Sequence, residues 1–381
     1  MNDYHAEKRA ISTASLNKSP RYAWNSESLF WSFYEQLDIS RRWQGSMLDA
    51  MGLGPIETPS RIVFSEPGVT LRAYGDEVSH TAPVLLMVPA PIKRPYIWDL
   101  IPAASVVQRC ISNGVRVYMI HWGQPGPEEE LCGLNEYADR LILNCLEVIE
   151  AELGQSQLFL AGHSLGGTLT AIFASLYPDR LRGLVLIAAP LHFGSTVGIF
   201  GPLAAAIDHA RHTARLPASV PGSFLSLLSF MASPSTFGGG RWLDLVKSLP
   251  DPQALRNHLR VERWTLDEMP MPRQLFEEVV QLLIREDRLL RGTLTVRGRR
   301  AAPELIRAPL LCIADARCRI VPPEAILPFH QAIGSADKRL LWYEGDKGVS
   351  LQHVGPLVGQ TAHQQLWPEI LRWIQTHSQK P

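Results

Sequence analysis

One serine in this sequence stands where a nucleophile could be activated. The segment GHSLG at residues 162–166 follows an apolar run at 158–161 and precedes a helix-like run at 168–176. A G-x-S-x-G segment between a strand and a helix forms a tight turn that projects the serine hydroxyl above the sheet. The N-terminus of the next helix favours developing negative charge. The pattern predicts that Ser164 is the nucleophile of an acyl-transfer reaction.

A serine hydroxyl needs a general base, and after this kind of turn the chain order is serine, acid, histidine. His353 is the predicted base, because it lies in a short loop between Gly348 and Gly355, after the last predicted strand. His363 is the competing histidine. It is expected to begin the C-terminal helix and to point elsewhere.

The acid is expected directly after the strand at residues 310–314. A typical segment there reads G-x-x-D-x-[IV]-V-P, whereas this chain has DARCRIVP at 315–322. Alignment on the final Val-Pro puts Cys318 where the aspartate belongs and Asp315 where the glycine belongs. Asp315 is nevertheless the predicted acid, because it immediately follows the strand and can reach the imidazole. Asp346, in the loop before His353, is the alternative, and helix capping is the structural role open to Asp315.

An oxyanion hole should combine two backbone N–H groups around the developing negative charge. One is the N–H of Leu165, directly after the nucleophile. The other should come from the loop at residues 89–92, after an early strand. Pro91 has no N–H, so the donor is Ile92 or Ala90, and Ile92 is preferred.

The elements that position these residues alternate along the chain. Continuous apolar runs at residues 84–88, 115–120, 158–161, 184–188, 310–314 and 340–343 predict strands buried on both faces. Helical patterns lie between them, at 106–112 for example. The expected fold class is α/β, a mostly parallel sheet with helices on both faces. Combined with the serine turn, this predicts the α/β-hydrolase fold.

Two segments stand outside this alternation. Residues 1–60 carry apolar positions at helical spacing and predict an N-terminal helical extension, followed by a catalytic domain at 61–381. An insertion at about 193–300 should form a lid or cap over the active site, and a separate small domain is the alternative. The apolar cluster Phe224, Leu225, Leu227, Leu228, Phe230 and Met231 either gates an acyl pocket or forms the core of the lid.

Composition narrows the class of protein further. The chain has 381 residues, 46% of them hydrophobic, and its 37 basic and 37 acidic residues leave no basic excess for nucleic acid. The polar start and the absence of a long apolar stretch predict no signal peptide and no transmembrane segment, and hence a cytoplasmic protein. The five cysteines show no C-x-x-C spacing and are expected to be reduced. No motif implies a metal or a nucleotide cofactor.

Three further strings resemble polyhydroxyalkanoate synthases. VPAPIKRPYIWDL at residues 88–100 is similar to the V-P-A-x-I-N-R-P-Y-I-x-D-L of that family, and HWGQP at 121–125 is similar to its D-W-G-x-P. His353-Val354-Gly355, followed by Trp367-Pro368 and Trp373, resembles its H-x-G loop and final helix. The resemblance covers roughly residues 60–381. It implies an enzyme that takes acyl-CoA thioesters of hydroxy acids, and it leaves a homodimer as a candidate assembly.

Two positions depart from that family. In that family the tight turn between strand and helix, called the nucleophile elbow, carries a nucleophilic cysteine where this chain has Ser164. The family's Asp-His pair is replaced here by Cys318-Arg319. The leading hypothesis is a serine acyltransferase or hydrolase acting on hydroxyacyl or fatty-acyl esters or thioesters, with acyl-CoA as a candidate substrate. Hydrolysis and transfer use the same catalytic groups and differ in whether the lid excludes water. The second hypothesis is a non-catalytic member of the family that binds granules or acyl chains.

Overall fold

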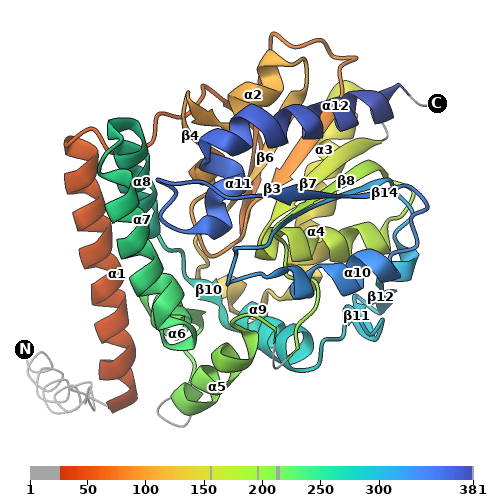
Figure 1. Cartoon of the computed structure of the whole chain (residues 1–381). Coiled ribbons are helices and arrows are strands. Elements are labelled where there is room, and N and C mark those ends of the chain that lie inside the picture. The colour runs from red at the N-terminus through yellow and green to blue at the C-terminus, as the bar shows by residue number, and fades with distance from the viewer. Residues whose placement is uncertain (1–25, 155–156, 195–196, 212–214, 380–381) are drawn as a thin grey trace, which may run out of the picture.

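An eight-stranded sheet forms the centre of the computed structural model, which describes residues 26–154, 157–194, 197–211 and 215–379 (Figure 1). The strand order is β1-β2-β6-β3-β7-β8-β13-β14. β2 is antiparallel to β1 and to β6, and the strands from β6 to β14 are parallel. The strands are β1 (Arg61–Glu66), β2 (Val69–Tyr74), β3 (Val84–Val88), β6 (Arg116–Trp122), β7 (Leu158–His163), β8 (Leu181–Ile187), β13 (Leu310–Asp315) and β14 (Lys338–Tyr343).

The apolar runs of the sequence correspond to the parallel strands. Every residue of β3, β7 and β13 is buried, as expected of strands covered on both faces. The predicted mostly parallel sheet is therefore confirmed. The apolar pattern does not predict β1 and β2, which lie at one end of the sheet. β1 is largely exposed, so its sequence lacks the continuous apolar run of a central strand.

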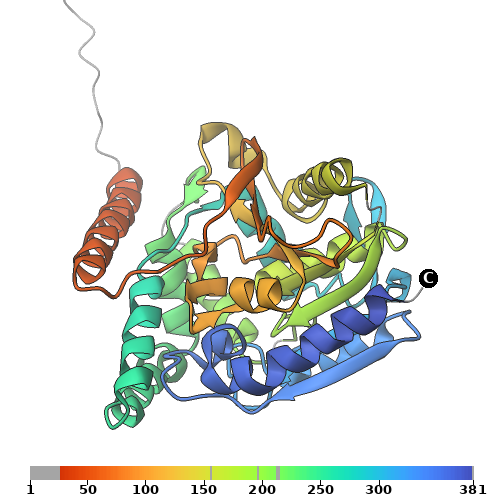
Figure 2. The same ribbon diagram turned by 90° about the horizontal axis from the view of Figure 1, so that it is seen from above.

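Helices cover both faces of the sheet (Figure 2). Leu86 packs in one core with α3 and α4, and its neighbour Leu85 packs in a second core with α2 and α12, because successive side chains of a strand point to opposite faces. Within the described residues, no helix combines the length and apolar character needed to cross a membrane. The helices are α1 (Ser26–Ala50), α2 (Val106–Ser112), α3 (Leu141–Leu153), α4 (Leu165–Leu176), α5 (Phe200–Arg211), α6 (Gly222–Ala232), α7 (Arg241–Ser248), α8 (Pro252–Thr265), α9 (Arg273–Glu278), α10 (Leu327–Ala332), α11 (Gly355–Val358) and α12 (Trp367–Ser378).

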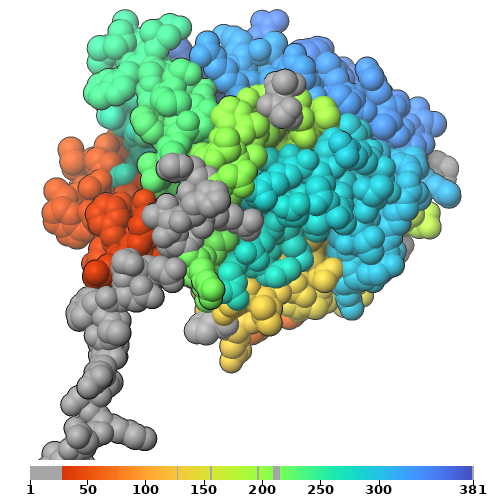
Figure 3. All heavy atoms as spheres, turned by 90° about the horizontal axis from the view of Figure 1, so that it is seen from below, coloured from red at the N-terminus to blue at the C-terminus, as the bar shows by residue number. Residues whose placement is uncertain are grey.

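A long insertion between β8 and β13 carries α5 to α9. Seen from below, it spreads across the face of the molecule between α1 and the segments that follow β13 (Figure 3). Residues 195–196 and 212–214 of the cap expected at 193–300 lie outside the described residues. The short strand pairs are β4 (Asp99–Ile101) with β5 (Ala104–Ser105), β9 (Ser219–Val220) with β10 (Met271–Pro272), and β11 (Leu294–Val296) with β12 (Arg299–Ala301).

Helix α1 forms most of the described part of the expected N-terminal extension, of which residues 1–25 lie outside the description. Its buried face places Trp31 and Tyr34 against Phe224 of α6, with ring centroids 4.9 and 5.3 Å apart. Asp38 accepts hydrogen bonds from the N–H groups of Gly222 and Ser223 at the start of α6. Such a cap is worth about 1 kcal/mol. The extension is therefore joined to the insertion.

Candidate active site

Ser164 occupies a strained turn between β7 and α4. Its backbone has φ 55° and ψ −134°, a conformation that L-residues rarely adopt and that is often kept at functional sites. The flanking glycines make the turn sterically feasible. A Cβ at Gly166 would lie 2.2 Å from the Val88 carbonyl oxygen, and one at Gly162 would lie 2.5 Å from Thr170 Oγ1. The backbone N–H of Ser164 donates to the carbonyl of Ile187, 3.1 Å away, which fixes the turn to β8.

The turn opens into a cavity of about 260 Å³. Ser164, His353, Leu165 and Ile92 all line it. The structure thus brings four of the five predicted site residues to one cavity. Its other walls are mostly apolar and include residues of the insertion, among them Phe193, Leu225, Leu228, Phe276 and Val280.

His353 lies in a short 3-10 turn, Gln352–Val354, that follows β14. Its side chain is buried, and Nε2 has no hydrogen-bond partner among the described residues. Burial holds the pKa of the imidazole well below its usual value, and the neighbouring His163 lowers it further. A neutral imidazole with a free ring nitrogen in the same cavity as a serine is compatible with a general base. His363 does not line this cavity, and its Nε2 donates to the carbonyl of Leu357.

His163 is a site residue that the sequence analysis missed. Its Nε2–H donates to the carbonyl oxygen of His353 over 2.8 Å, and the two rings have centroids 4.8 Å apart. Burial lowers the pKa of His163 to about 4, so it holds the His353 loop as a neutral donor. It is the variable residue of the G-x-S-x-G motif. No periodicity or spacing in a single sequence indicates that the side chain at this position contacts His353.

Asp315 does not have the hydrogen bond to His353 that the sequence analysis expected. It ends β13, and its Oδ1 accepts the N–H of Arg317 at 2.7 Å, which caps the turn after the strand. Oδ2 is buried without a hydrogen-bond partner among the described residues. Burial raises the pKa of this carboxyl group. The expected contact fails because the carboxylate folds back onto its own turn, the role that Asx residues commonly have in loops.

Asp346 is also engaged elsewhere. It accepts hydrogen bonds from the Tyr343 hydroxyl at 2.6 Å and from the N–H and hydroxyl of Thr361. The group in contact with the imidazole is Cys318, whose Sγ lies 3.5 Å from His353 Nδ1. The alignment on Val321-Pro322 had placed Cys318 at the acid position. The structure puts its sulfur where the carboxylate oxygen would be.

The loop after β3 is held from two sides. The indole Nε1–H of Trp122 donates to the carbonyl of Pro89 at 2.7 Å, and the N–H of Met269 donates to the carbonyl of Ile92 at 3.1 Å. Trp122 is the tryptophan of the HWGQP string, so that string now has a structural role. An oxyanion hole needs donors that do not reorganise during the reaction, and both contacts restrain this loop.

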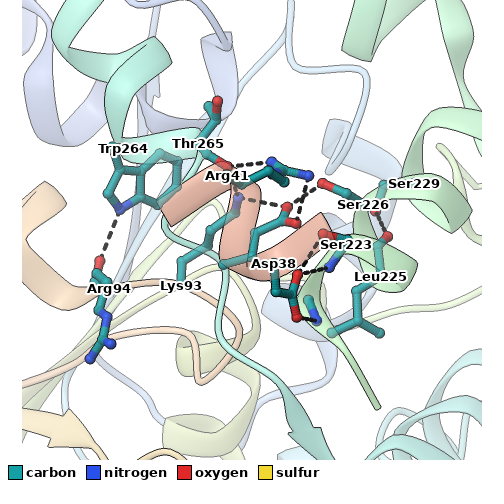
Figure 4. A network of polar contacts seen from close by, with 12 residues as sticks. Asp38, Arg41, Lys93, Arg94, Ser223, Leu225, Ser226, Ser229, Trp264 and Thr265 are labelled. Atoms are coloured by element: carbon teal, nitrogen blue, oxygen red, sulfur yellow. Dashed lines mark hydrogen bonds and ion pairs between the residues drawn. The ribbon is translucent and has the colours of Figure 1, made fainter. Parts of the chain in front are cut away.

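A part-buried ionic cluster forms the polar wall of the same cavity (Figure 4). Lys93 Nζ lies 2.7 Å from Glu268 Oε1 and donates to the carbonyl of Thr265. Arg41 of α1 lies 3.1 Å from Glu268 Oε2, and Ser226 of α6 also donates to Glu268. Burial lowers the pKa of Lys93. The cluster therefore joins the loop after β3 to α1 and to the insertion.

A second and larger groove meets the site from the side of Cys318. It measures about 1710 Å³, and His353 and Cys318 line it. Two carboxylates line it, Asp244 and Asp346, and both already accept hydrogen bonds from other residues of the protein. The groove is basic, and its cationic residues are Arg109, Lys247, Arg256, Arg260, Arg317, Arg319 and Lys347.

Comparisons with known proteins agree with this architecture. The family model for the alpha/beta hydrolase fold matches residues 83–209. The poly(3-hydroxyalkanoate) polymerase subunit PhaC of Haloferax mediterranei is 29% identical over 329 residues, which cover 85% of this chain but only 65% of that relative. PhaC of Allochromatium vinosum is 25% identical, and the match covers 89% of this chain and 96% of the relative.

Solved structures show the same fold. A monoacylglycerol lipase of Paleococcus ferrophilus superposes with a TM-score of 0.51 at 20% identity, covering 81% of this chain and 99% of the lipase. Together with the sheet order and the elbow, these matches establish the α/β-hydrolase fold.

Proposed function

We propose that this chain, a polyhydroxyalkanoate synthase-like α/β-hydrolase, is a serine acyl-transfer enzyme whose acyl intermediate forms on Ser164. One observation carries the proposal. The strained Ser164 and the free Nε2 of His353 line one cavity, in the fold in which that pair performs acyl transfer. Relatives named as polymerase subunits and a lipase of the same fold support the broader class.

In the proposed reaction, Ser164 Oγ attacks the acyl carbon while its proton passes to His353 Nε2. The N–H groups of Leu165 and Ile92 stabilise the oxyanion, a contribution worth about 10²–10³ in turnover for each donor. Collapse of the adduct breaks the bond to the leaving group, which departs with the proton from Nε2. Water or an alcohol then takes the acyl group by the reverse sequence.

The cavity and the groove support two substrate features. The apolar walls, with Leu225 and Leu228 of the insertion, suit a medium or long acyl chain better than acetyl. Of the predicted apolar cluster, Leu225 and Leu228 line the pocket. Phe224 is buried outside the lining, and Leu227, Phe230 and Met231 are exposed. The basic groove suits a phosphate-bearing leaving group such as coenzyme A.

The experiment is intact-mass detection of an acyl adduct after incubation with acyl-CoAs and oxygen esters of two to twelve carbons. We expect a mass increase of one acyl group in the parent protein and none in the Ser164→Ala variant. An octanoyl donor should react faster than an acetyl donor, and high salt should slow acyl-CoA but not a neutral ester. If neither adducts nor labelling by a fluorophosphonate occur, the non-catalytic acyl-chain-binding alternative replaces this proposal.

We also propose a homodimer. Helices α1 and α7 expose large apolar side chains, with Trp43 65% and Trp242 69% accessible, and a patch formed by such side chains would suit an interaction surface. Light scattering of the parent and of the Trp43→Glu and Trp242→Glu variants would test it, and a monomeric parent at all concentrations would contradict it. The cytoplasmic location expected from the sequence stays a prediction.

A further inference from the structure

The side chain next to the catalytic imidazole is a thiol. Cys318 Sγ lies 3.5 Å from His353 Nδ1, and both residues are buried, with 2% and 8% of their surface accessible. The N–H of Val321 also approaches Sγ, at 3.4 Å. The sulfur is therefore fixed between a backbone donor and the ring. In the usual triad a carboxylate accepts the Nδ1–H at this place.

The sulfur can act in one of two directions, because a thiol is both a weak donor and a weak acceptor. If Sγ accepts the Nδ1–H, the proton sits on Nδ1, and Nε2 carries a lone pair toward the cavity shared with Ser164. If the S–H donates to Nδ1, the proton sits on Nε2, and the ring cannot act as a base. The N–H of Val321 already donates to the sulfur, so the thiol is held in place without donating its own S–H. Acceptance of the Nδ1–H is the direction that leaves Nε2 able to act as the base in the proposed reaction.

We propose that Cys318 is the positioning residue of His353, and that it selects the Nδ1–H tautomer through its sulfur without supplying a negative charge. The inference rests on the proposed function and deepens it, because it names the third member of the catalytic array. Cys318 acts through His353 and touches no reacting atom. The reaction is as written above, with the Ser164 proton passing to Nε2 and then to the leaving group, while the Nδ1 proton stays in place.

A neutral partner of His353 orients the ring but, unlike a carboxylate, does not stabilise its protonated form. A carboxylate would both orient the ring and stabilise the imidazolium formed during attack. Burial raises the pKa of the Cys318 thiol to about 11, so sulfur remains uncharged at neutral pH and orients only. The titratable groups around the imidazole are His163, which contacts the ring, and Asp315, which lies beside Cys318 on the same turn. Cys318→Asp should therefore raise the pKa of His353.

The first test is ¹⁵N NMR of the full-length protein labelled at histidine, which identifies the ring tautomer whether or not the protein is active. In the parent we expect His353 to be protonated at Nδ1. Cys318→Ala should populate both tautomers. Cys318→Asp should keep Nδ1–H and raise the pKa at which the ring titrates. Asp315→Asn is the matched control on the same turn and should leave the tautomer unchanged. A parent protonated at Nε2 would overturn the inference.

The second test is the rate at which a fluorophosphonate labels Ser164. We expect Cys318→Ala to lower the maximal labelling rate at least tenfold with little change in half-saturation. Cys318→Asp should recover the parent rate or exceed it, with the acid limb of the pH profile moved upward. Equal rates in the parent and in Cys318→Ala would show that the thiol only packs. An unlabelled parent with the expected tautomer would refute the proposed function and leave the positioning contact intact.

Discussion

Gly166→Ala is the substitution whose effect follows most directly from the geometry. The added Cβ would lie 2.2 Å from the Val88 carbonyl oxygen and 2.6 Å from the Pro89 carbonyl carbon. Both atoms belong to the backbone, so a change of side-chain rotamer cannot relieve the clash. Ordinary contacts begin near 3.4 Å, and the loop after β3 or the start of α4 must therefore move by about 1 Å, because a close-packed interior has no free space there.

That movement separates the two halves of the predicted oxyanion hole, since Leu165 lies on α4 and Ile92 lies on the loop. A displacement of about 1 Å can lower turnover by ~10²-fold, while overpacking costs ~1–3 kcal/mol of stability. We expect fluorophosphonate labelling to slow by about two orders of magnitude in a protein that still unfolds cooperatively in urea.

The control is Gly239→Ala, because a Cβ at that helical glycine meets nothing within 4 Å. It should label at the parent rate and unfold at an equal or higher urea concentration. A Gly166→Ala variant that also labels at the parent rate would refute the argument that this loop and α4 together build the site.

Four other predictions follow. Ser164→Ala should abolish acyl transfer, by about a million-fold, with an unchanged thermal melt, and residual activity within tenfold of the parent would contradict the nucleophile assignment. The labelling rate should stay constant as the pH falls to 6.5 and drop only below it, because attack needs neutral His353 and its pKa is lowered; a midpoint at or above 6.5 would contradict this. Asp315→Asn should slow labelling by less than about tenfold, only ~1.4 kcal/mol, and a collapse of turnover would restore Asp315 as the acid. Glu268→Gln should destabilise folding by roughly 1.5–3 kcal/mol, because it removes the charge that pairs with two part-buried cations while both keep the carbonyl of Thr265, whereas breaking the exposed Arg339–Glu369 pair should cost below ~1 kcal/mol.

The sequence predicted the parts of the site that depend on local patterns. Strands buried on both faces need continuous apolar runs, and the elbow needs small residues at Gly162 and Gly166 because backbone and a neighbouring hydroxyl approach within 3 Å. The position of His353 followed from the chain order of the fold. Each of these constraints acts on a short segment, so each produces a pattern that can be recognised in the sequence.

Contacts between residues that are far apart in the chain produce no local sequence pattern. Lys93 and Glu268 form a part-buried ion pair across 175 residues, and nothing around either residue predicts the other. The prediction of Asp315 as the orienting acid assumed that the first carboxylate after β13 reaches the imidazole. That carboxylate instead satisfies the N–H of Arg317, a local hydrogen bond that competes with the distant one.

In the proposed reaction, the groups around Ser164 and His353 determine where the barrier to acyl transfer is lowered. A serine depends on its base more than a cysteine does, yet the proposed base, His353, has a neutral thiol as its neighbour, and burial keeps the pKa of its imidazole low. Within the described residues no carboxylate contacts Nδ1, so the charge that would develop during the proposed attack receives no such support there. Stabilisation falls instead on the oxyanion side, where Trp122 and Met269 restrain the donor loop and Gly166 allows α4 to approach it. For this reason a methyl group at Gly166 should slow the reaction more than loss of the charge at Asp315.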